Sequence, residues 1–206
     1  MKILSLLAQK GGVGKSTLTL HWAVEAHRQH YGQVAVIDMD LQASATKWYE
    51  RRGQDFPLLL RADKSNVTEA VEACRASGVN LVFIDTMPRV EESSVAAARV
   101  ADLSVIPCGP SVLDIEAIMH TIAITNSVKT PGVIVINQGR HSSGINDKAK
   151  AVLQQYGIPV CPVTIMRRAA LEDAFIDGRA VTELRPNSKA AREITASWKW
   201  IVNQLQ

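Results

Sequence analysis

The chain lacks most of the features that mark secreted, membrane and metal-cluster proteins. Its three cysteines are scattered and include no C-x-x-C pair, so we expect reduced thiols in a cytoplasmic protein. No apolar run approaches the roughly eighteen residues that a membrane span needs, and the first residues do not form a signal peptide. The net charge of +3 is too small to require a nucleic-acid partner by itself. A soluble cytoplasmic protein is therefore expected.

What the chain does contain is an alternation of short apolar segments with longer helical patterns. The apolar segments are nearly continuous, as strands buried on both faces must be; they lie at 3–8, 34–38, 81–85, 103–107, 132–137 and 159–165, with a shorter one at 58–61. Helical patterns lie near 15–30, 43–52, 66–77, 92–101, 112–127, 145–157, 169–177 and 188–205. This order predicts an α/β fold with one doubly wound, mostly parallel sheet and helices on both faces. No linker interrupts it, so residues 1–206 are expected to form a single domain.

A glycine-rich loop, KGGVGKST at 10–17, lies between the first apolar segment and the first helical pattern. Glycines let backbone N–H groups turn towards an anion, and the following helix N-terminus adds unpaired N–H groups. Lys15 is placed to reach the β- and γ-phosphates, and the Ser16 hydroxyl to bind Mg²⁺. The loop departs from the usual template because Gln9 stands where its first glycine would be. We expect nucleotide contacts from Lys10, Gly11, Gly12, Val13, Gly14, Lys15, Ser16 and Thr17.

Carboxylates end two of the predicted strands. Asp38 and Asp40 follow the segment 34–38, and Asp85 closes the segment 81–85. Such a cluster is costly without a nearby cation, and Mg²⁺ bound with a nucleotide supplies one. Ser16, Asp38 and Asp85 are therefore the expected metal residues, with Asp85 in the place of a Walker B aspartate. Aspartates that merely form turns after strands remain the alternative.

The loop resembles the deviant Walker A motif, KGGxGK[ST], of the ParA/MinD family of ATPases. The resemblance implies an ATP-dependent sandwich dimer in which Lys10 reaches the phosphates of the partner's nucleotide. It also implies that Asp40, in a segment similar to the family's D-x-D-P-Q motif, positions the attacking water, while Asp38 supports the metal and the loop. Lys10, Lys15 and Asp40 are thus the expected catalytic residues. Leu41 replaces the proline of that motif, and Met87 replaces one proline of the family's D-T-P-P segment.

Three later stretches extend the resemblance. Residues 106–114 look like the family's I-P-x-x-P-S-x-x-D loop, which lies near the nucleotide and the dimer interface. Asn137 matches an asparagine that contacts adenine in relatives, although a strand-end turn residue is the plainer interpretation. Pro186 begins a segment similar to P-x-S-x-x-A, which flanks the base in the family. ATP and Mg²⁺ are the cofactors that the resemblance implies.

Among the functions found in this group, the favoured hypothesis is DNA segregation by a ParA-type ATPase. The resemblance then implies nonspecific DNA binding by the ATP-bound homodimer, release when a small centromere-binding activator stimulates hydrolysis, and association with the nucleoid. Nonspecific DNA binding needs basic residues on one face rather than a recognition helix. The candidates, chosen from a slightly basic C-terminal region, are Arg167, Arg168, Lys189 and Arg192. Ala170 stands where relatives with an R-x-x-R pattern have their second arginine.

Two other classes remain open. A MinD-like membrane ATPase needs a terminal amphipathic helix with a basic face, but the terminus ITASWKWIVNQLQ carries Lys199 as its sole cation. Docking of this helix on the core is the simpler explanation, so no stable membrane association is expected. A metabolic enzyme of the dethiobiotin synthetase type would not require Lys10 to act across a dimer. Positioning of another cytoplasmic cargo is a variant of the first hypothesis.

Overall fold

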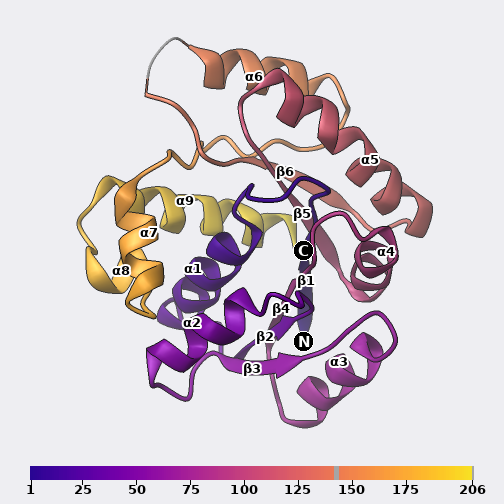
Figure 1. Cartoon of the computed structure of the whole chain (residues 1–206), viewed down its shortest axis with the longest axis vertical. Coiled ribbons are helices and arrows are strands. Elements are labelled where there is room, and N and C mark those ends of the chain that lie inside the picture. Colours follow the sequence, from indigo (N-terminus) through magenta and orange to yellow (C-terminus); the bar gives the residue numbers. More distant parts are fainter. Residues whose placement is uncertain (142–143, 206) are drawn as a thin grey trace.

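The computed structural model describes residues 1–141 and 144–205, and its centre is a six-stranded sheet (Figure 1). All strand pairs are parallel, in the order β3-β2-β4-β1-β5-β6. The strands are β1 (Lys2–Leu6), β2 (Val34–Asp38), β3 (Leu58–Arg61), β4 (Leu81–Asp85), β5 (Leu103–Cys108) and β6 (Gly132–Ile136). The doubly wound parallel fold predicted from the alternation of elements, including the short strand at 58–61, is confirmed.

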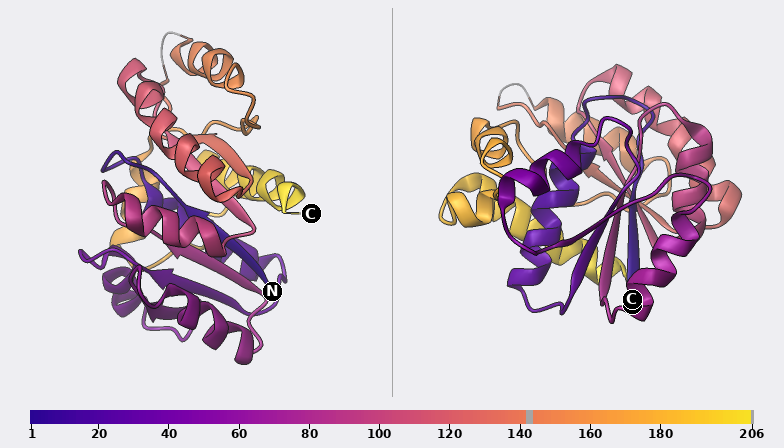
Figure 2. Two further views of the ribbon diagram at one scale, coloured as in Figure 1. Left: turned by 90° about the vertical axis from the view of Figure 1, so that its right-hand side faces the viewer. Right: turned by 60° about the horizontal axis from the view of Figure 1, so that its bottom comes forward.

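Helices cover both faces of the sheet, as Figure 2 shows. The helices are α1 (Lys15–Arg28), α2 (Ser44–Arg52), α3 (Val67–Ala76), α4 (Glu91–Val100), α5 (Val112–Val128), α6 (Ile145–Gln154), α7 (Ala169–Ile176), α8 (Val181–Leu184) and α9 (Lys189–Gln204). Contacts join α1 to α2, α8 and α9, and they join α4 to α3 and α5. The short helix α8 was not expected from the sequence.

Successive side chains of a strand pack alternately against the two helix layers. On β2, Val34 and Val36 pack in the core that contains α1 and α9, whereas Ala35 and Ile37 pack in the core that contains α3 and α4. A strand points successive side chains to opposite faces, so a strand covered on both sides must be apolar throughout. This explains the unbroken apolar segments of the sequence.

The predicted strand at 159–165 is wrong. The segment runs beside β6 and exchanges backbone hydrogen bonds with it, including Cys161 N to Ile134 O at 2.8 Å and Ile165 N to Ile136 O at 2.9 Å. Only isolated bridges form, however, because Pro159 and Pro162 have no N–H to donate to a ladder. The segment is an irregular covering of the sheet edge.

The C-terminal helix α9 packs on the core, as expected. Trp198 and Ile201 are buried against the sheet and α1, and the Trp22 indole N–H donates to Ser197 Oγ at 3.0 Å. Its apolar face is thus occupied within the molecule. Over the residues that the structure describes, no helix combines the length and apolar character needed to cross a membrane.

Strand register brings the polar ends of three strands together. The β2–β4 pairing places Asp38 opposite Asp85, and the β1–β4 pairing places Leu6 opposite Asp85. The glycine-rich loop follows β1, so the chain enters it from beside Asp85, with Asp38 one strand farther away. Ligands of open parallel sheets bind at this carboxyl edge.

Candidate functional site

The glycine-rich loop has the backbone shape of an anion cradle. Gly12 and Gly14 have φ values of +76° and +90°, which side chains with a Cβ rarely adopt. Gly14 precedes α1 directly, and no side chain caps that helix end. The first N–H groups of α1 are therefore open towards the loop, where the helix dipole favours an anion.

Lys15 points into the molecule beside this cradle. It is 7% exposed, and its Nζ donates a long hydrogen bond of 3.4 Å to the carbonyl of Ala8. Burial lowers the pKa of Lys15, while the charges of Asp85 and Asp40 raise it. A single weak acceptor leaves the ammonium group available to a phosphate oxygen.

A hollow of about 400 Å³ lies over the loop and collects most of the predicted phosphate residues. It is lined by Gly11, Gly12, Gly14, Lys15, Ser16, Thr17, Asp40, Gln42, Ser44, Pro88, Gln138 and Phe175. Gln42, Ser44, Pro88, Gln138 and Phe175 were not predicted. Gln42 ends the segment that resembles D-x-D-P-Q, and Gln138 directly follows Asn137, whereas Phe175 lies on α7 and nothing in its local sequence signals the contact.

Asp85 is the residue best suited to a metal. It is fully buried, and neither carboxylate oxygen accepts a hydrogen bond of ordinary geometry in the described part of the chain. Burial raises the pKa of Asp85 to about 7, with Ser16 nearby lowering it and Asp38 raising it. A buried carboxylate without partners is unfavourable unless a cation joins it. The pair of Asp85 and Ser16 therefore fits Mg²⁺ bound with a nucleotide.

Asp38 instead holds the loop that follows β2. Its Oδ1 accepts from Asp40 N at 3.0 Å, and its Oδ2 accepts from Thr46 N at 3.0 Å and from Thr46 Oγ1 at 2.8 Å. These bonds fix the start of α2 and the position of Asp40. The part that Asp38 was expected to play at the metal and the loop during the reaction stays a prediction.

Lys10 lies on the other side of the glycine loop from Lys15. Its side chain is 44% exposed and forms an ion pair with Asp114 of the same chain. Asp114 also belongs to the capping box of α5 with Ser111. Burial raises the pKa of Asp114, but the hydrogen bonds from Lys10 and Ser111 outweigh it and hold the pKa below its usual value. Lys10 does not line the phosphate hollow of its own chain.

A second hollow of about 270 Å³ continues from the phosphate hollow, and we call it the base pocket. It is lined by Gly12, Gly14, Thr17, Asn137, Gln138, Met166, Arg167, Arg168, Leu171 and Glu172. Asn137 Nδ2 donates to Val13 O at 2.7 Å, and Gln138 Nε2 donates to Gly12 O at 2.6 Å, so both side chains brace the glycine loop. Asn137, the predicted adenine contact, therefore lines this pocket, whereas Pro186 is not among the lining residues.

The four predicted DNA-binding residues have different surroundings. Arg167 lines the base pocket and is exposed. Arg168 forms a bidentate ion pair with Glu193, which neutralises its charge within the chain. Lys189 and Arg192 are exposed at the start of α9. Sequence reasoning missed Glu193.

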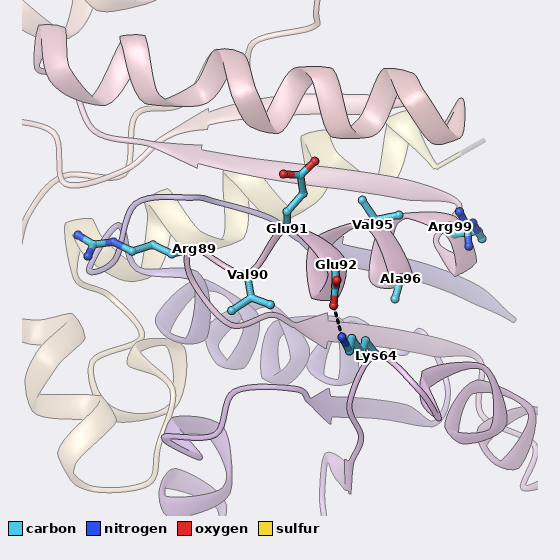
Figure 3. A pocket seen from close by; sticks show the side chains of 8 residues that line it. All are labelled: Lys64, Arg89, Val90, Glu91, Glu92, Val95, Ala96 and Arg99. Carbon is cyan, nitrogen blue, oxygen red and sulfur yellow. Dashed lines mark hydrogen bonds and ion pairs between the residues drawn. The ribbon is translucent and has the colours of Figure 1, made fainter.

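A hollow larger than these two lies elsewhere, along α4 (Figure 3). It measures about 860 Å³, is open to solvent, and is bridged by the ion pair between Lys64 and Glu92. Arg89 and Arg99 lie at its opposite ends (Figure 3). No predicted nucleotide or metal residue lines it. Size alone would therefore have identified the wrong site.

Comparison with known proteins agrees with this geometry. A family model described as the CobQ/CobB/MinD/ParA nucleotide binding domain matches residues 4–181. Maintenance of carboxysome distribution protein A from Gloeobacter kilaueensis is 28% identical over an alignment of 207 positions, which covers 99% of this chain and 94% of the relative. Protein IncC from Escherichia coli is 23% identical over an alignment of 257 positions, which covers 100% of this chain and 70% of the relative.

Solved structures share the fold at low sequence identity. The cell division ATPase MinD from Pyrococcus furiosus superposes with a TM-score of 0.80 at 16% identity, covering 98% of this chain and 99% of that one. A putative plasmid partition protein from Borrelia burgdorferi B31, bound to AMPPNP, gives a TM-score of 0.77 at 17% identity, with 98% and 99% covered. The family model, the fold and the glycine loop lead to one conclusion: the chain belongs to the CobQ/CobB/MinD/ParA nucleotide-binding domain family.

Proposed function

We propose that this chain is a ParA-type positioning ATPase, in which ATP assembles a sandwich dimer on nonspecific DNA and hydrolysis releases it. The observation that carries the proposal is the opposite placement of the two lysines of one loop. Lys15 is buried beside its own phosphate hollow, whereas Lys10 is exposed and turned away from it. A lysine in that position is suited to the nucleotide of a second copy.

The surface around the phosphate hollow supports such a dimer. The four most exposed of the large apolar side chains among the described residues are Leu41, Val112, Leu113 and Ile176. Leu41 and Ile176 neighbour Asp40 and Phe175, which line the hollow. Leu113 neighbours Asp114, the ion-pair partner of Lys10. Exposed apolar groups that border a polar site favour association with another surface.

Hydrolysis is assigned to the residues that line the hollow. Lys15 offsets the charge of the β- and γ-phosphates, and Asp40, whose Oδ1 is held by Gln42 N at 2.9 Å, orients the attacking water. Ser16 and Asp85 would hold Mg²⁺, which neutralises charge that develops on the phosphate oxygens. A small centromere-binding protein is the proposed activator, and the nucleoid the proposed location.

DNA contact is assigned to the start of α9, where Lys189 and Arg192 are exposed, together with Arg167. Arg168 contributes less to this surface because Glu193 pairs with it. Two subunits double the number of cations, which makes DNA binding conditional on the dimer.

The cargo has two candidates. Segregation of a plasmid or chromosome is the prediction from the sequence, and Protein IncC and the Borrelia protein are similar along the whole of this chain. Positioning of a cytoplasmic cargo is favoured by the two relatives named for carboxysome distribution, at 28% and 24% identity over nearly their whole length.

The dimer assignment is tested by light scattering with a nonhydrolysable ATP analogue. Wild-type protein should double in mass, and Lys10→Ala should remain monomeric while binding a fluorescent ATP analogue within about threefold of wild type. Lys129→Ala, which changes a lysine beyond α5, is the matched control and should dimerise normally. A normal dimer from Lys10→Ala would refute the assignment.

A further inference from the structure

Glu193 joins the C-terminal helix α9 to the wall of the base pocket. Its Oε1 accepts from Arg168 Nη2 at 2.6 Å, and its Oε2 accepts from the backbone N–H of Met166 at 3.1 Å. Arg168 Nε adds bonds of 3.2 Å to both oxygens. The two charged side chains are 19% and 17% exposed, so the pair is shielded from solvent more than a surface ion pair.

The segment that Glu193 holds has no strand ladder to support it. Beyond β6 it is tied by Gly139 N to Ile165 O and by Arg167 N to Gly139 O, both at 2.9 Å. The N–H of Met166 lies between these bonds and points the other way, to Glu193. Backbone N–H groups need an acceptor when they leave water, and here a side chain from a distant helix provides it.

The same segment supplies one wall of the base pocket, through Met166, Arg167 and Arg168. The helix that supplies Glu193 begins with Lys189 and Arg192, the exposed cations assigned to DNA. Lys189 lies one helical turn before Glu193, and Arg192 is its neighbour. One side chain therefore links the pocket wall to the basic start of α9.

We propose that Glu193 is a positioning residue that shapes the base pocket and couples its occupation to the basic start of α9. The pocket part stands on the geometry above, and the coupling part rests on the proposed function. A nucleotide base that packs on the wall fixes residues 166–168, and Glu193 then holds the first turns of α9 in one position. Without Glu193 the wall and the helix move independently.

The pocket part is tested by titrating fluorescent ATP and ADP analogues. Glu193→Ala removes both acceptor oxygens and should weaken binding of the triphosphate and the diphosphate equally, about tenfold, because the phosphate end is untouched. Glu193→Gln keeps an oxygen for Met166 N and should stay within about threefold of wild type. Glu69→Ala, which removes an exposed carboxylate of α3 outside the base pocket, is the matched control and should bind normally.

Two results would overturn the pocket part: wild-type affinity in Glu193→Ala, or an equal weakening in Glu69→Ala. Thermal melts accompany each titration. If Glu193→Ala fails to fold, Arg168→Met removes the same ion pair through its other partner. Wild-type nucleotide affinity in Arg168→Met would then overturn the pocket part.

The coupling part is tested by measuring ATP-analogue affinity with and without a saturating DNA duplex. If the two sites are coupled, DNA increases the affinity for the nucleotide by a certain factor, and the nucleotide increases the affinity for DNA by the same factor. This factor should fall towards one in Glu193→Ala and remain in Glu69→Ala; an unchanged factor in Glu193→Ala would contradict the coupling. If wild-type protein binds no DNA, the proposed function and the coupling fail together, while the result for the pocket stands by itself.

Discussion

The phosphate end and the base end of the nucleotide cleft differ in what holds them. At the phosphate end, Asp38 and Asp85 are buried where adjacent parallel strands end, strand register places them opposite each other, and the buried Lys15 begins α1. At the base end, Arg167 and Glu172 are exposed on segments outside the sheet, and support comes from side chains such as Asn137 and Glu193. The residues assigned to the chemistry thus lie on rigid elements, whereas the pocket assigned to the base depends on long-range contacts that can be altered singly.

The largest effect is expected at the buried end. Lys15→Ala removes the cation that faces the β- and γ-phosphates and should abolish nucleotide binding, with affinity falling at least about 100-fold. Titration with a fluorescent ATP analogue measures it. Retention of near-normal affinity would show that the base end, and not the phosphate end, carries most of the binding.

A smaller effect, confined to turnover, is expected for Asp40. Asp40→Ala should bind the ATP analogue and dimerise, but hydrolyse ATP at least about tenfold more slowly, because a positioned water matters only in the transition state. Phosphate release under stimulated and unstimulated conditions gives the rates. Wild-type turnover in this variant would transfer the role to another group at the hollow.

Substitutions at two glycines test the contact between the glycine loop and Asn137, which joins the phosphate end to the base end. Gly14 has a φ of +90°, and a Cβ there would lie 2.3 Å from Asn137 Nδ2, whereas a Cβ at Gly11 meets nothing within 4 Å. Gly14→Ala should therefore lower nucleotide affinity about tenfold, since it strains the loop and displaces Asn137. Gly11→Ala is the matched control. Similar affinities for the two variants would mean that the brace from Asn137 is dispensable.

The smallest effect on nucleotide affinity, none at pH 7, is expected at His21, where the change concerns stability. His21 of α1 accepts a hydrogen bond from Val181 N of α8 at 3.1 Å, and burial lowers its pKa from 6.5 to about 4, although Glu183 raises it. His21 is therefore protonated below about pH 6.5 in the unfolded chain, but only below about pH 4 in the folded chain. Stability should fall as pH drops through this window, by up to about 1.4 kcal/mol per pH unit.

His21→Asn retains an acceptor for Val181 N but does not titrate, so its stability should depend less steeply on pH. Urea unfolding of both proteins at several pH values between about 4 and 7 gives the two slopes. Equal slopes would mean that His21 takes up its proton equally well in the folded chain.

The same contrast explains what the sequence could reveal. The glycine loop, Asp38, Asp40 and Asp85 are local patterns at strand ends, and a parallel sheet brings such ends together by its topology. The ion pair of Lys10 with Asp114 joins residues 104 positions apart, and Glu193 meets Arg168 across 25 positions. No periodicity encodes such pairings. The false strand at 159–165 had the right apolar composition, but its prolines prevented a ladder.

The dependence of DNA binding on nucleotide tests the central proposal most directly. Fluorescence anisotropy on two unrelated duplexes, over a series of salt concentrations, compares wild-type protein with ATP and with ADP. The ATP state should bind both duplexes equally, and the combined change of Arg167, Arg168, Lys189 and Arg192 to alanine should flatten the salt dependence by about 0.9 in slope for each DNA phosphate that no longer meets a cation. Equal affinity in the ATP and ADP states, or no DNA binding beside clear binding to anionic liposomes, would contradict the proposed cycle.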